Sequence, residues 1–326
     1  MENQVRVCEN EAVIVGRLKE KKINFNRTAE GKVMATGYLV LATENQYGKG
    51  EVRVSVMQNA LTKDNKENSL YKGLVTVDNE YKSLKETGDI ETADLIKITG
   101  SLNDETYYSV KKGEFVEKIG TRATFVNRIE RVDKSGETVE DKVNVALEGY
   151  IAEIKPANDE LEVKFITIGY GGVAVPVTAF VPKELVVPFQ GRHQVGQTTT
   201  LYIAIVNTVE TTKVEKEVGF GVGFGEKIER TIIKNIIFGG GAINYNQAYT
   251  QDQVRQALAL REVKLEEKKT KAIEKEAKKG NNGSMTAGFG APQGGFTVPQ
   301  GNASPQGGFG TPINGGFSMP TGGFGV

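Results

Sequence analysis

Residues 33–43 read Val-Met-Ala-Thr-Gly-Tyr-Leu-Val-Leu-Ala-Thr, and apolar side chains largely alternate along them, at Val33, Ala35, Leu39 and Leu41. The same alternation returns in residues 52–56, where Val alternates with Arg and Ser. A period of two is typical of a β-strand that buries one face. Both stretches are therefore predicted to be half-buried strands.

Three more strands are predicted around this pair, at residues 11–19, 95–100 and 121–130. The one helical-looking stretch among them, residues 79–87, lies between the third and the fourth strand. Five strands with a helix in that gap is the order of elements in an OB-fold barrel. A second set follows in the same order, without an evident residue-level repeat, at residues 143–154, 161–169, 173–181, 200–208 and 227–238.

The C-terminal part of the chain has a different composition. Thr250–Lys279 predicts one helix, because Thr250 and Gln253 have the spacing of a capping box and Gly280 follows as a stop. Its second half, mostly Glu and Lys, is typical of a solvated spacer, with a dimerising or a docking helix as alternatives. Residues 280–326 are rich in Gly and Pro and carry no charge, which predicts a disordered tail. Its spaced Phe residues fit either a plain tether or a segment that contacts partners.

The expected fold class is therefore all-β: two tandem OB-fold-like five-stranded barrels, then a C-terminal helix and a disordered Gly-rich tail. A polar, turn-rich segment at 133–141 separates the two sets of strands. The predicted domains are residues 1–138, 139–245, 246–279 and 280–326.

Composition favours a binding protein over an enzyme. The 326 residues include 41 Lys and Arg against 41 Asp and Glu. The single cysteine, Cys8, excludes a disulfide framework and a metal site with several cysteines. The single histidine, His193, excludes a metal site with several histidines and argues against a His-based catalytic triad. We therefore expect no metal and no cofactor. His193 is interpreted as an ordinary loop residue. No apolar run reaches the ~18–20 residues of a membrane span and no signal segment is evident, so we expect a cytoplasmic protein with no membrane partner.

Two glycine-rich stretches resemble nucleotide-binding motifs only superficially. Residues 169–174 match the dinucleotide pattern G-x-G-x-x-A, but the strand-like residues and the proline that follow favour a hairpin turn over a helix start. Residues 219–225 lack the Gly-Lys-Ser/Thr ending of a phosphate loop and are predicted to form a hairpin tip.

Short stretches of the first predicted barrel follow one another in a characteristic order: Ala12-Val-Ile-Val-Gly16-Arg17-Leu18, Gly31-Lys-Val-Met-Ala35, Leu39-Val-Leu-Ala42-Thr43, Leu95-Ile-Lys-Ile-Thr-Gly100-Ser-Leu102 and Gly120-Thr-Arg122. Here the chain resembles the bacterial and phage single-stranded DNA-binding proteins of the OB-fold type. The resemblance covers about residues 11–131, and a barrel followed by a disordered tail is also that family's layout. It implies sequence-independent binding of single-stranded DNA.

The resemblance also implies a set of DNA-binding residues. That family stacks bases on aromatic rings, which tolerates any sequence because every base has a π-face, and follows the phosphates with Lys and Arg. Tyr47 and Tyr107 fill two of its stacking positions, whereas two others fall near Val52 and Gln58. Tyr38 and Arg53, opposite the apolar series of their strands, are candidates to replace the lost contacts. The remaining candidates are Arg17, Lys19, Lys21, Lys22, Tyr108, Lys111, Lys112 and Phe115 in the first barrel, and Tyr170, Phe180 and Tyr202 in the second.

The expected partner is single-stranded DNA, in phage DNA replication, recombination or repair, and the expected state is a monomer or small homo-oligomer. Contacts with replication or recombination proteins through the tail stay open, because residues 322–326 lack the acidic tip of the bacterial relatives. A net charge of zero is unusual for a DNA binder. Two alternatives therefore remain: a structural or assembly protein, such as a virion or scaffold component, and an RNA- or tRNA-binding barrel.

Overall fold

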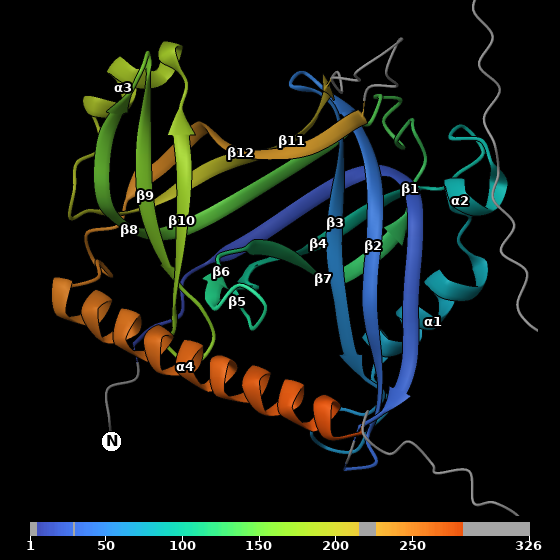
Figure 1. Ribbon diagram of the computed structural model, residues 1–326. Helices are drawn as coiled ribbons and strands as arrows, with labels where there is room; N and C mark the ends of the chain where they lie inside the picture. The colour runs from blue at the N-terminus through green and yellow to red at the C-terminus, as the bar shows by residue number, and fades with distance from the viewer. Residues whose placement is uncertain (1–4, 29, 215–225, 283–326) are drawn as a thin grey trace, which may run out of the picture. The chain divides into compact units, whose positions relative to one another are not determined.

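The computed structural model describes residues 5–28, 30–214 and 226–282, and these residues form two barrels and a long helix (Figure 1). The first barrel is built from β1 (Asn10–Arg27), β2 (Val33–Asn45), β3 (Gly48–Asn59), β4 (Leu95–Asp104) and β7 (Ile119–Arg128). Neighbouring strands follow the order β1-β2-β3-β7-β4, and β4 pairs back onto β1. Only β3 and β7 are parallel, so this is the closed OB-fold order that the alternation predicted.

The helices of the first barrel differ from the prediction. The gap between β3 and β4 holds α1 (Ser69–Glu80) and the single turn α2 (Leu84–Thr87). The predicted helix at 79–87 was therefore wrong at residues 81–83, and it missed residues 69–78. The side chain of Asn68 caps α1 by accepting from the N–H of Leu70. Leu74 and Val77 then close one end of the barrel over the buried residues of its strands.

The second barrel repeats this topology. Its strands are β8 (Lys142–Ala157), β9 (Glu160–Ile168), β10 (Ala174–Val181), β11 (Thr198–Val214) and β12 (Glu226–Ile243). They follow the order β8-β9-β10-β12-β11 with β11 closing onto β8, and β10 and β12 form the parallel pair. Two short helices, η1 (Lys183–Leu185) and α3 (Val186–Gln190), occupy the same gap as α1 and α2. All five predicted strands of this set are confirmed, whereas the domain boundaries at 138 and 245 stay predictions.

A structural repeat relates the two barrels. Gly16 in β1 and Gly149 in β8 lie where the neighbouring strand passes so close that a Cβ would sit 2.5 Å from Ala42 O and 2.6 Å from Ile166 O, respectively. In both strands a bulge follows within four residues, between Leu18 and Glu20 and between Ile151 and Glu153. The repeat that the residues alone do not reveal is therefore present in backbone geometry.

The first strands of the two barrels pair with each other. Asn10–Val15 of β1 lie antiparallel to Lys142–Leu147 of β8, which joins the barrels into one ten-stranded sheet. Ile205 of β11 packs against the cores of both barrels, so the hydrophobic contacts are continuous as well. The two barrels therefore hold each other by main-chain hydrogen bonds and by a shared apolar contact.

Helix α4 (Gln251–Asn282) follows the second barrel and lies along one side of the molecule (Figure 1). Thr250 and Gln253 form the predicted capping box: the N–H of Thr250 donates to Gln253 Oε1 at 2.9 Å, and the N–H of Gln253 to Thr250 Oγ1 at 3.2 Å. Val254 and Ala257 pack with Val5, and Arg261 reaches the first barrel at Asp104. The helix is thus docked rather than a free spacer, and it continues two residues past the predicted stop at Gly280.

Three other predictions have clear outcomes. Residues 169–174 form the predicted hairpin turn, with Gly171 and Gly172 at positive φ. His193 lies in a loop but is buried against Phe189, and burial lowers its pKa. The glycine stretch 219–225 and the tail from residue 283 onward lie outside the described residues. None of the helices in residues 5–28, 30–214 and 226–282 combines the length and the apolar composition that a membrane span requires.

Candidate nucleic-acid interface

The outer face of the first barrel presents a cross-strand row made of Lys22, Tyr38 and Ser55. Since alternation sends Leu39 and Val54 into the core, this row points outward. The guanidinium of Arg53, one row further, lies over the Tyr38 ring with Cζ 3.7 Å from the ring centroid. A planar cation on an aromatic ring offers a flat, positively charged surface on which a base can stack.

Glu20 balances part of this charge. Its carboxylate accepts from Lys85 Nζ at 3.2 Å and from the Tyr38 hydroxyl at 3.3 Å. The hydrogen bond from Lys85 is the main reason that the pKa of Glu20 lies below its usual value, and the one from Tyr38 adds to the effect. The carboxylate therefore stays charged and fixes the Tyr38 hydroxyl, while Lys22 remains the exposed cation of the row.

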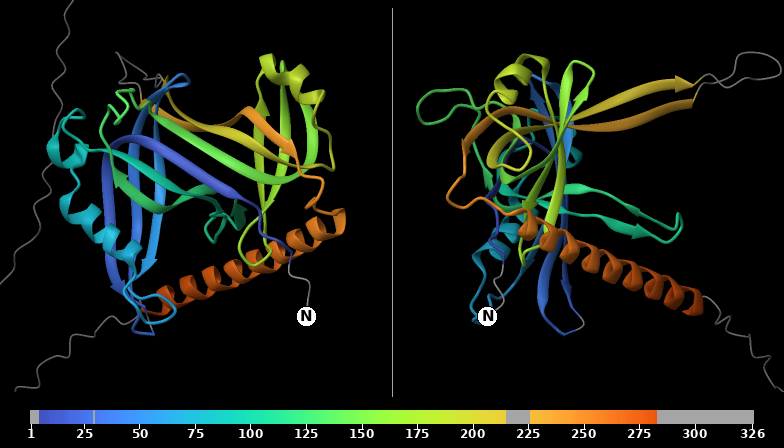
Figure 2. Two further views of the ribbon diagram at one scale, coloured as in Figure 1. Left: turned by 180° about the vertical axis from the view of Figure 1, so that it is seen from behind. Right: turned by 90° about the vertical axis from the view of Figure 1, so that its left-hand side faces the viewer.

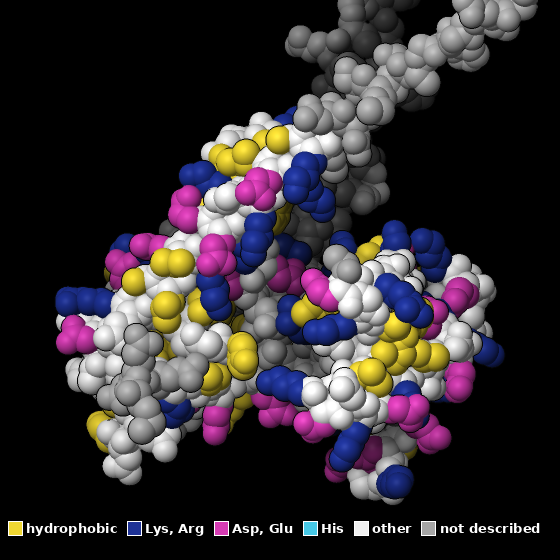
Figure 3. Space-filling view, turned by 90° about the horizontal axis from the view of Figure 1, so that it is seen from below, with side chains coloured by type: hydrophobic (Ala, Val, Ile, Leu, Met, Phe, Trp, Pro, Cys, Tyr) yellow, Lys and Arg dark blue, Asp and Glu magenta, His cyan; other side chains and the backbone are white. Residues whose placement is uncertain are grey.

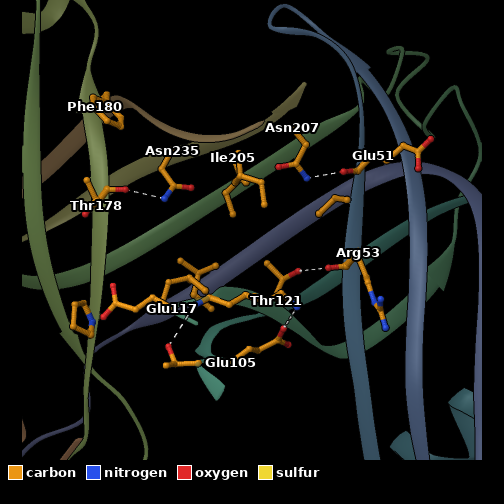
Figure 4. Close-up of a pocket in the computed structure, with 18 of the residues that line it drawn as sticks. Glu51, Arg53, Glu105, Glu117, Thr121, Thr178, Phe180, Ile205, Asn207 and Asn235 are labelled. Atoms are coloured by element: carbon orange, nitrogen blue, oxygen red, sulfur yellow. Dashed lines mark hydrogen bonds and ion pairs between the residues drawn. The ribbon is translucent and has the colours of Figure 1, made fainter. Parts of the chain in front are cut away.

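A cleft of about 670 Å³ lies between the two barrels (Figure 4). Three carboxylates and three cations line it, so it has no net charge. Phe180, on the outer face of β10, lines the side opposite Arg53, and Lys234 Nζ lies 5.1 Å from the Phe180 ring centroid. Polar and apolar side chains from both barrels complete the lining, among them Glu51, Thr121, Thr178, Ile205, Asn207 and Asn235.

Two hairpin arms project from the same side of the molecule and border this cleft (Figure 2). One is formed by β11 and β12, and the other by β5 (Tyr107–Ser109) and β6 (Glu114–Val116), which lie between β4 and β7. The first arm is fixed to the first barrel at Asn207 of β11. Asn207 Nδ2 donates to Glu51 O at 2.6 Å. The carbonyl oxygen of Asn207 also lies so close to Gly50 that any side chain at position 50 would clash with it. At the base of the second arm, Leu102 and Ile119 pack into the core of the second barrel. Each arm therefore holds the opposite barrel.

The β5–β6 hairpin carries five of the predicted residues. Tyr107 is 51% exposed, and Lys111 and Lys112 are exposed at the turn. Tyr108 packs edge-on against Phe115, with ring centroids 5.2 Å apart. Lys269 of α4 lies 5.8 Å from the Tyr108 ring centroid, so a helix predicted to be a spacer adds a cation to this hairpin.

Tyr47 lies in a different environment. It sits at the β2–β3 turn beside a cavity of about 550 Å³ that is lined by one lysine and four carboxylates, namely Asp133, Glu137, Glu140 and Asp141. A net negative surface repels the phosphates that accompany a stacked base. Tyr47 lines this acidic cavity and not the cleft, so it is not part of the candidate interface.

Three of the four predicted cations of β1 are already engaged. Arg17 donates to Ala93 O at 2.7 Å and pairs with Glu91, and Lys19 pairs with Glu51. Lys21, with a side chain only 8% exposed, donates to the main-chain carbonyls of Val77, Asp78 and Tyr81 at the end of α1. Such carbonyls attract a cation, so Lys21 stabilises the helix end instead of facing solvent.

The candidates of the second barrel are dispersed. Tyr170 is 89% exposed at the β9–β10 turn, whereas Phe180 faces the cleft. Tyr202 pairs with Phe238 across β11 and β12, with ring centroids 6.2 Å apart. Sequence reasoning missed Phe238 and Lys234. Both lie on the face of β12 opposite buried Ile237, so the rule that selected Tyr38, a position opposite the apolar series of its strand, would also have selected them.

Fold and interface together define a class: a chain with two OB-fold barrels whose outer faces border one cleft between two arms. The sequence matches the family model YorF over residues 9–271, and the chain belongs to this family. Among solved structures, it is similar to the wild-type single-stranded DNA binding protein from Thermus aquaticus, with 12% identity and a TM-score of 0.45, covering 75% of this chain and 98% of that one. A deletion mutant of that Thermus aquaticus protein gives 13% identity and a TM-score of 0.43, covering 72% and 95%. A search of curated proteins finds no match.

Proposed function

We propose that this chain is a non-catalytic protein that binds single-stranded DNA without sequence preference, in phage DNA replication or recombination. The observation that carries the proposal is the pair of aromatic–cation contacts, Arg53 on Tyr38 and Lys234 on Phe180, on two outer faces that border one cleft. The Tyr38 contact combines a surface for stacking with a charge for the phosphate. Lys234 is already paired with both carboxylate oxygens of Glu160 at 2.7 Å, so the Phe180 contact offers chiefly a ring. Neither contact selects a base, because stacking requires only a π-face.

The neutral cleft supports binding that depends more on stacking than on charge. Each stacked base contributes about 1–3 kcal/mol, and each neutralised phosphate changes the salt slope by about 0.7 on single strands. With equal numbers of carboxylates and cations in the cleft, few counterions are released there. The affinity is therefore expected to fall only gradually as salt rises.

The pairing of β1 with β8 supports a monomer. In a one-barrel chain the outer edge of the first strand is open to a second copy, but here the second barrel of the same chain occupies it. We infer a monomer in solution and a cytoplasmic location. Sedimentation that shows large assemblies without DNA would instead favour the structural alternative.

Tyr107→Ala tests the proposal. Tyr107 is half-exposed on an arm beside the cleft, and losing one stacked base weakens binding by about 10-fold. Fluorescence anisotropy with a labelled mixed-sequence oligonucleotide measures the affinity. Tyr245→Ala is the matched control, since Tyr245 is 77% exposed and does not line the cleft.

Two results would overturn the assignment: no binding of the oligonucleotide by the wild-type protein, or equal affinities for the Tyr107 variant and the control. Competition by an RNA oligomer of the same sequence separates DNA from RNA as the partner. A stronger competitor RNA would move the assignment to an RNA-binding barrel.

A further inference from the structure

A second cavity, of about 440 Å³, lies between α4 and the barrels. The end of β4, the start of β7, the β9–β10 turn and residues 261–268 of α4 all line it. Viewed from below, Lys and Arg side chains lie along α4 and beside the hollow between the helix and the first barrel (Figure 3). The helix therefore completes a cavity that neither barrel forms alone.

The charge of this cavity sets it apart from the cleft and from the Tyr47 cavity. Four cations line it, namely Arg122, Arg261, Lys264 and Lys268, against the single carboxylate of Asp104. That carboxylate is fully engaged, because Arg261 Nε donates to it at 2.8 Å and the N–H of Thr106 at 3.0 Å. The balance of charge thus favours an anion.

Arg122 lacks a partner inside this cavity. Its Nε is buried and has no hydrogen-bond partner within the described residues. Burying an unpaired donor of a charged group is costly, so proteins rarely keep one without a ligand. Lys264 also has no hydrogen bond or ion pair among the described residues. Its Nζ lies beside Gly171 in the β9–β10 turn, 3.7 Å from the position that a Cβ on Gly171 would take. Two positive groups from opposite sides are therefore left for an incoming anion.

The cavity adjoins the proposed path of the DNA. Leu102 and Arg261 line both this cavity and the cleft, so the two share part of a wall. Lys268 donates to Thr106 O at 2.8 Å, next to Tyr107 on the arm. Tyr170, 89% exposed, lies at the rim and offers a ring for a neighbouring base. The cavity therefore adjoins both the cleft and the base of the β5–β6 arm.

We propose that the cavity beneath α4 binds a backbone phosphate of the single strand, held by Arg122 and Lys264. This inference rests on the proposed function, and it assigns α4 to the DNA-binding surface. Arg122 presents a rigid fork of donors that suits phosphate oxygens, and Lys264 adds a compact charge from the helix. Arg261, held by Asp104, shapes the wall between cleft and cavity.

The test compares Arg122→Gln and Lys264→Gln with Lys271→Gln. Lys271 lies on the same helix but lines a separate, acidic surface, so its substitution makes the same change of charge without touching the cavity. Anisotropy with an oligothymidylate is measured from low to moderate salt. Each cavity variant is expected to reduce the salt slope by about 0.7 and to weaken binding about 5–10-fold at low salt, whereas Lys271→Gln matches the wild type.

Lysine acetylation read by mass spectrometry provides a second measurement that needs no variant. The oligothymidylate is expected to protect Lys264 in the wild-type protein and to leave Lys271 reactive. Two results would overturn the phosphate site while the proposed function stands. One is that the wild type binds the oligothymidylate and both cavity variants keep its salt slope. The other is that Lys264 is acetylated equally with and without the oligothymidylate. Protection by inorganic pyrophosphate but not by the oligonucleotide would likewise overturn the assignment to a DNA strand. Absence of any binding by the wild type refutes the proposed function itself.

Discussion

The two barrels share one backbone plan but differ on their outer faces. The row Lys22, Tyr38 and Ser55 of the first barrel corresponds, through the shared bulge, to Lys155, Glu162 and Phe180 of the second. The first strand keeps its lysine in both rows, whereas the aromatic residue moves from the second strand to the third. The next row exchanges Arg53 for Thr178. Backbone geometry is thus repeated where the barrel must close, and side chains diverge where the surface is free to change.

The difference assigns unequal tasks to the two faces. The first barrel offers a tyrosine already covered by an arginine, whereas in the second Lys164 is engaged by Glu153 at 2.9 Å. Glu162 also places a negative charge in the middle of the second row. The first barrel is therefore expected to contribute more to DNA binding, with Phe180 as a secondary contact.

The largest effect is expected at the two equivalent glycines. Gly16→Ala and Gly149→Ala each force a Cβ against a main-chain oxygen, so we expect each to lower the free energy of unfolding by about 2–4 kcal/mol. Gly73→Ala, in α1, meets no atom within 4 Å and is expected to stabilise the protein by about 1 kcal/mol. Urea unfolding measures all three. If only one of the two β-strand variants is destabilised, the repeat is not equivalent in energy.

A smaller effect separates the two faces in binding. Tyr38→Ala removes the ring beneath Arg53 and is expected to weaken single-stranded DNA binding about 10-fold, and Phe180→Ala about 3-fold. Tyr38→Phe keeps the ring and should bind nearly as the wild type does. Anisotropy titrations check the order of the variants, and a larger loss for Phe180→Ala would reverse the ranking of the barrels.

The smallest effect concerns pH and a position where the repeat breaks. Glu148 precedes Gly149 in β8, where the equivalent residue before Gly16 in β1 is Val15. The side chain of Glu148 is 5% exposed and accepts two hydrogen bonds from Arg6 at 2.7 Å. The hydrogen bond from Arg6, together with those from Glu9 N–H and Asn244, outweighs burial and holds the pKa of Glu148 below its usual value. This stabilisation is complete above the ordinary glutamate pKa and is lost as pH falls through the lowered one.

Glu148→Gln is therefore expected to cost about 1 kcal/mol at neutral pH and to flatten the acid limb of the stability curve. Urea unfolding between neutral pH and the acid range measures both effects. An acid limb as steep in the variant as in the wild type would show that other carboxylates determine it.

The sequence predicted the strands well because each carries its own signal. The alternation in residues 33–43 survives in the fold as buried Ala35, Leu39 and Leu41 against outward Tyr38. Helix α1 was missed because Gly73 and the β-branched Val75, Thr76 and Val77 are weak helix formers, and the packing of Leu74 and Val77 on the barrel decides its state.

The site was harder to predict because its environment is not local. Spacing selected Tyr47, but the carboxylates beside it come from a loop about 90 residues away, at 133–141. Tyr38 and Arg53 were found because alternation within each strand places them on the face opposite its apolar side chains. Arg122 and Lys264, by contrast, meet only through the docking of α4, for which residues 250–279 give no signal beyond a charged helix.

The arrangement of β1 and β8 has a consequence for how the molecule withstands damage. The chain passes from one barrel to the other through an exposed loop at 129–141, yet what joins the halves is sheet pairing and the two interlocked arms. A protease that cuts this loop would yield two fragments that migrate together until denatured. We therefore expect the non-covalent contacts between the barrels to hold the halves of a cleaved chain together.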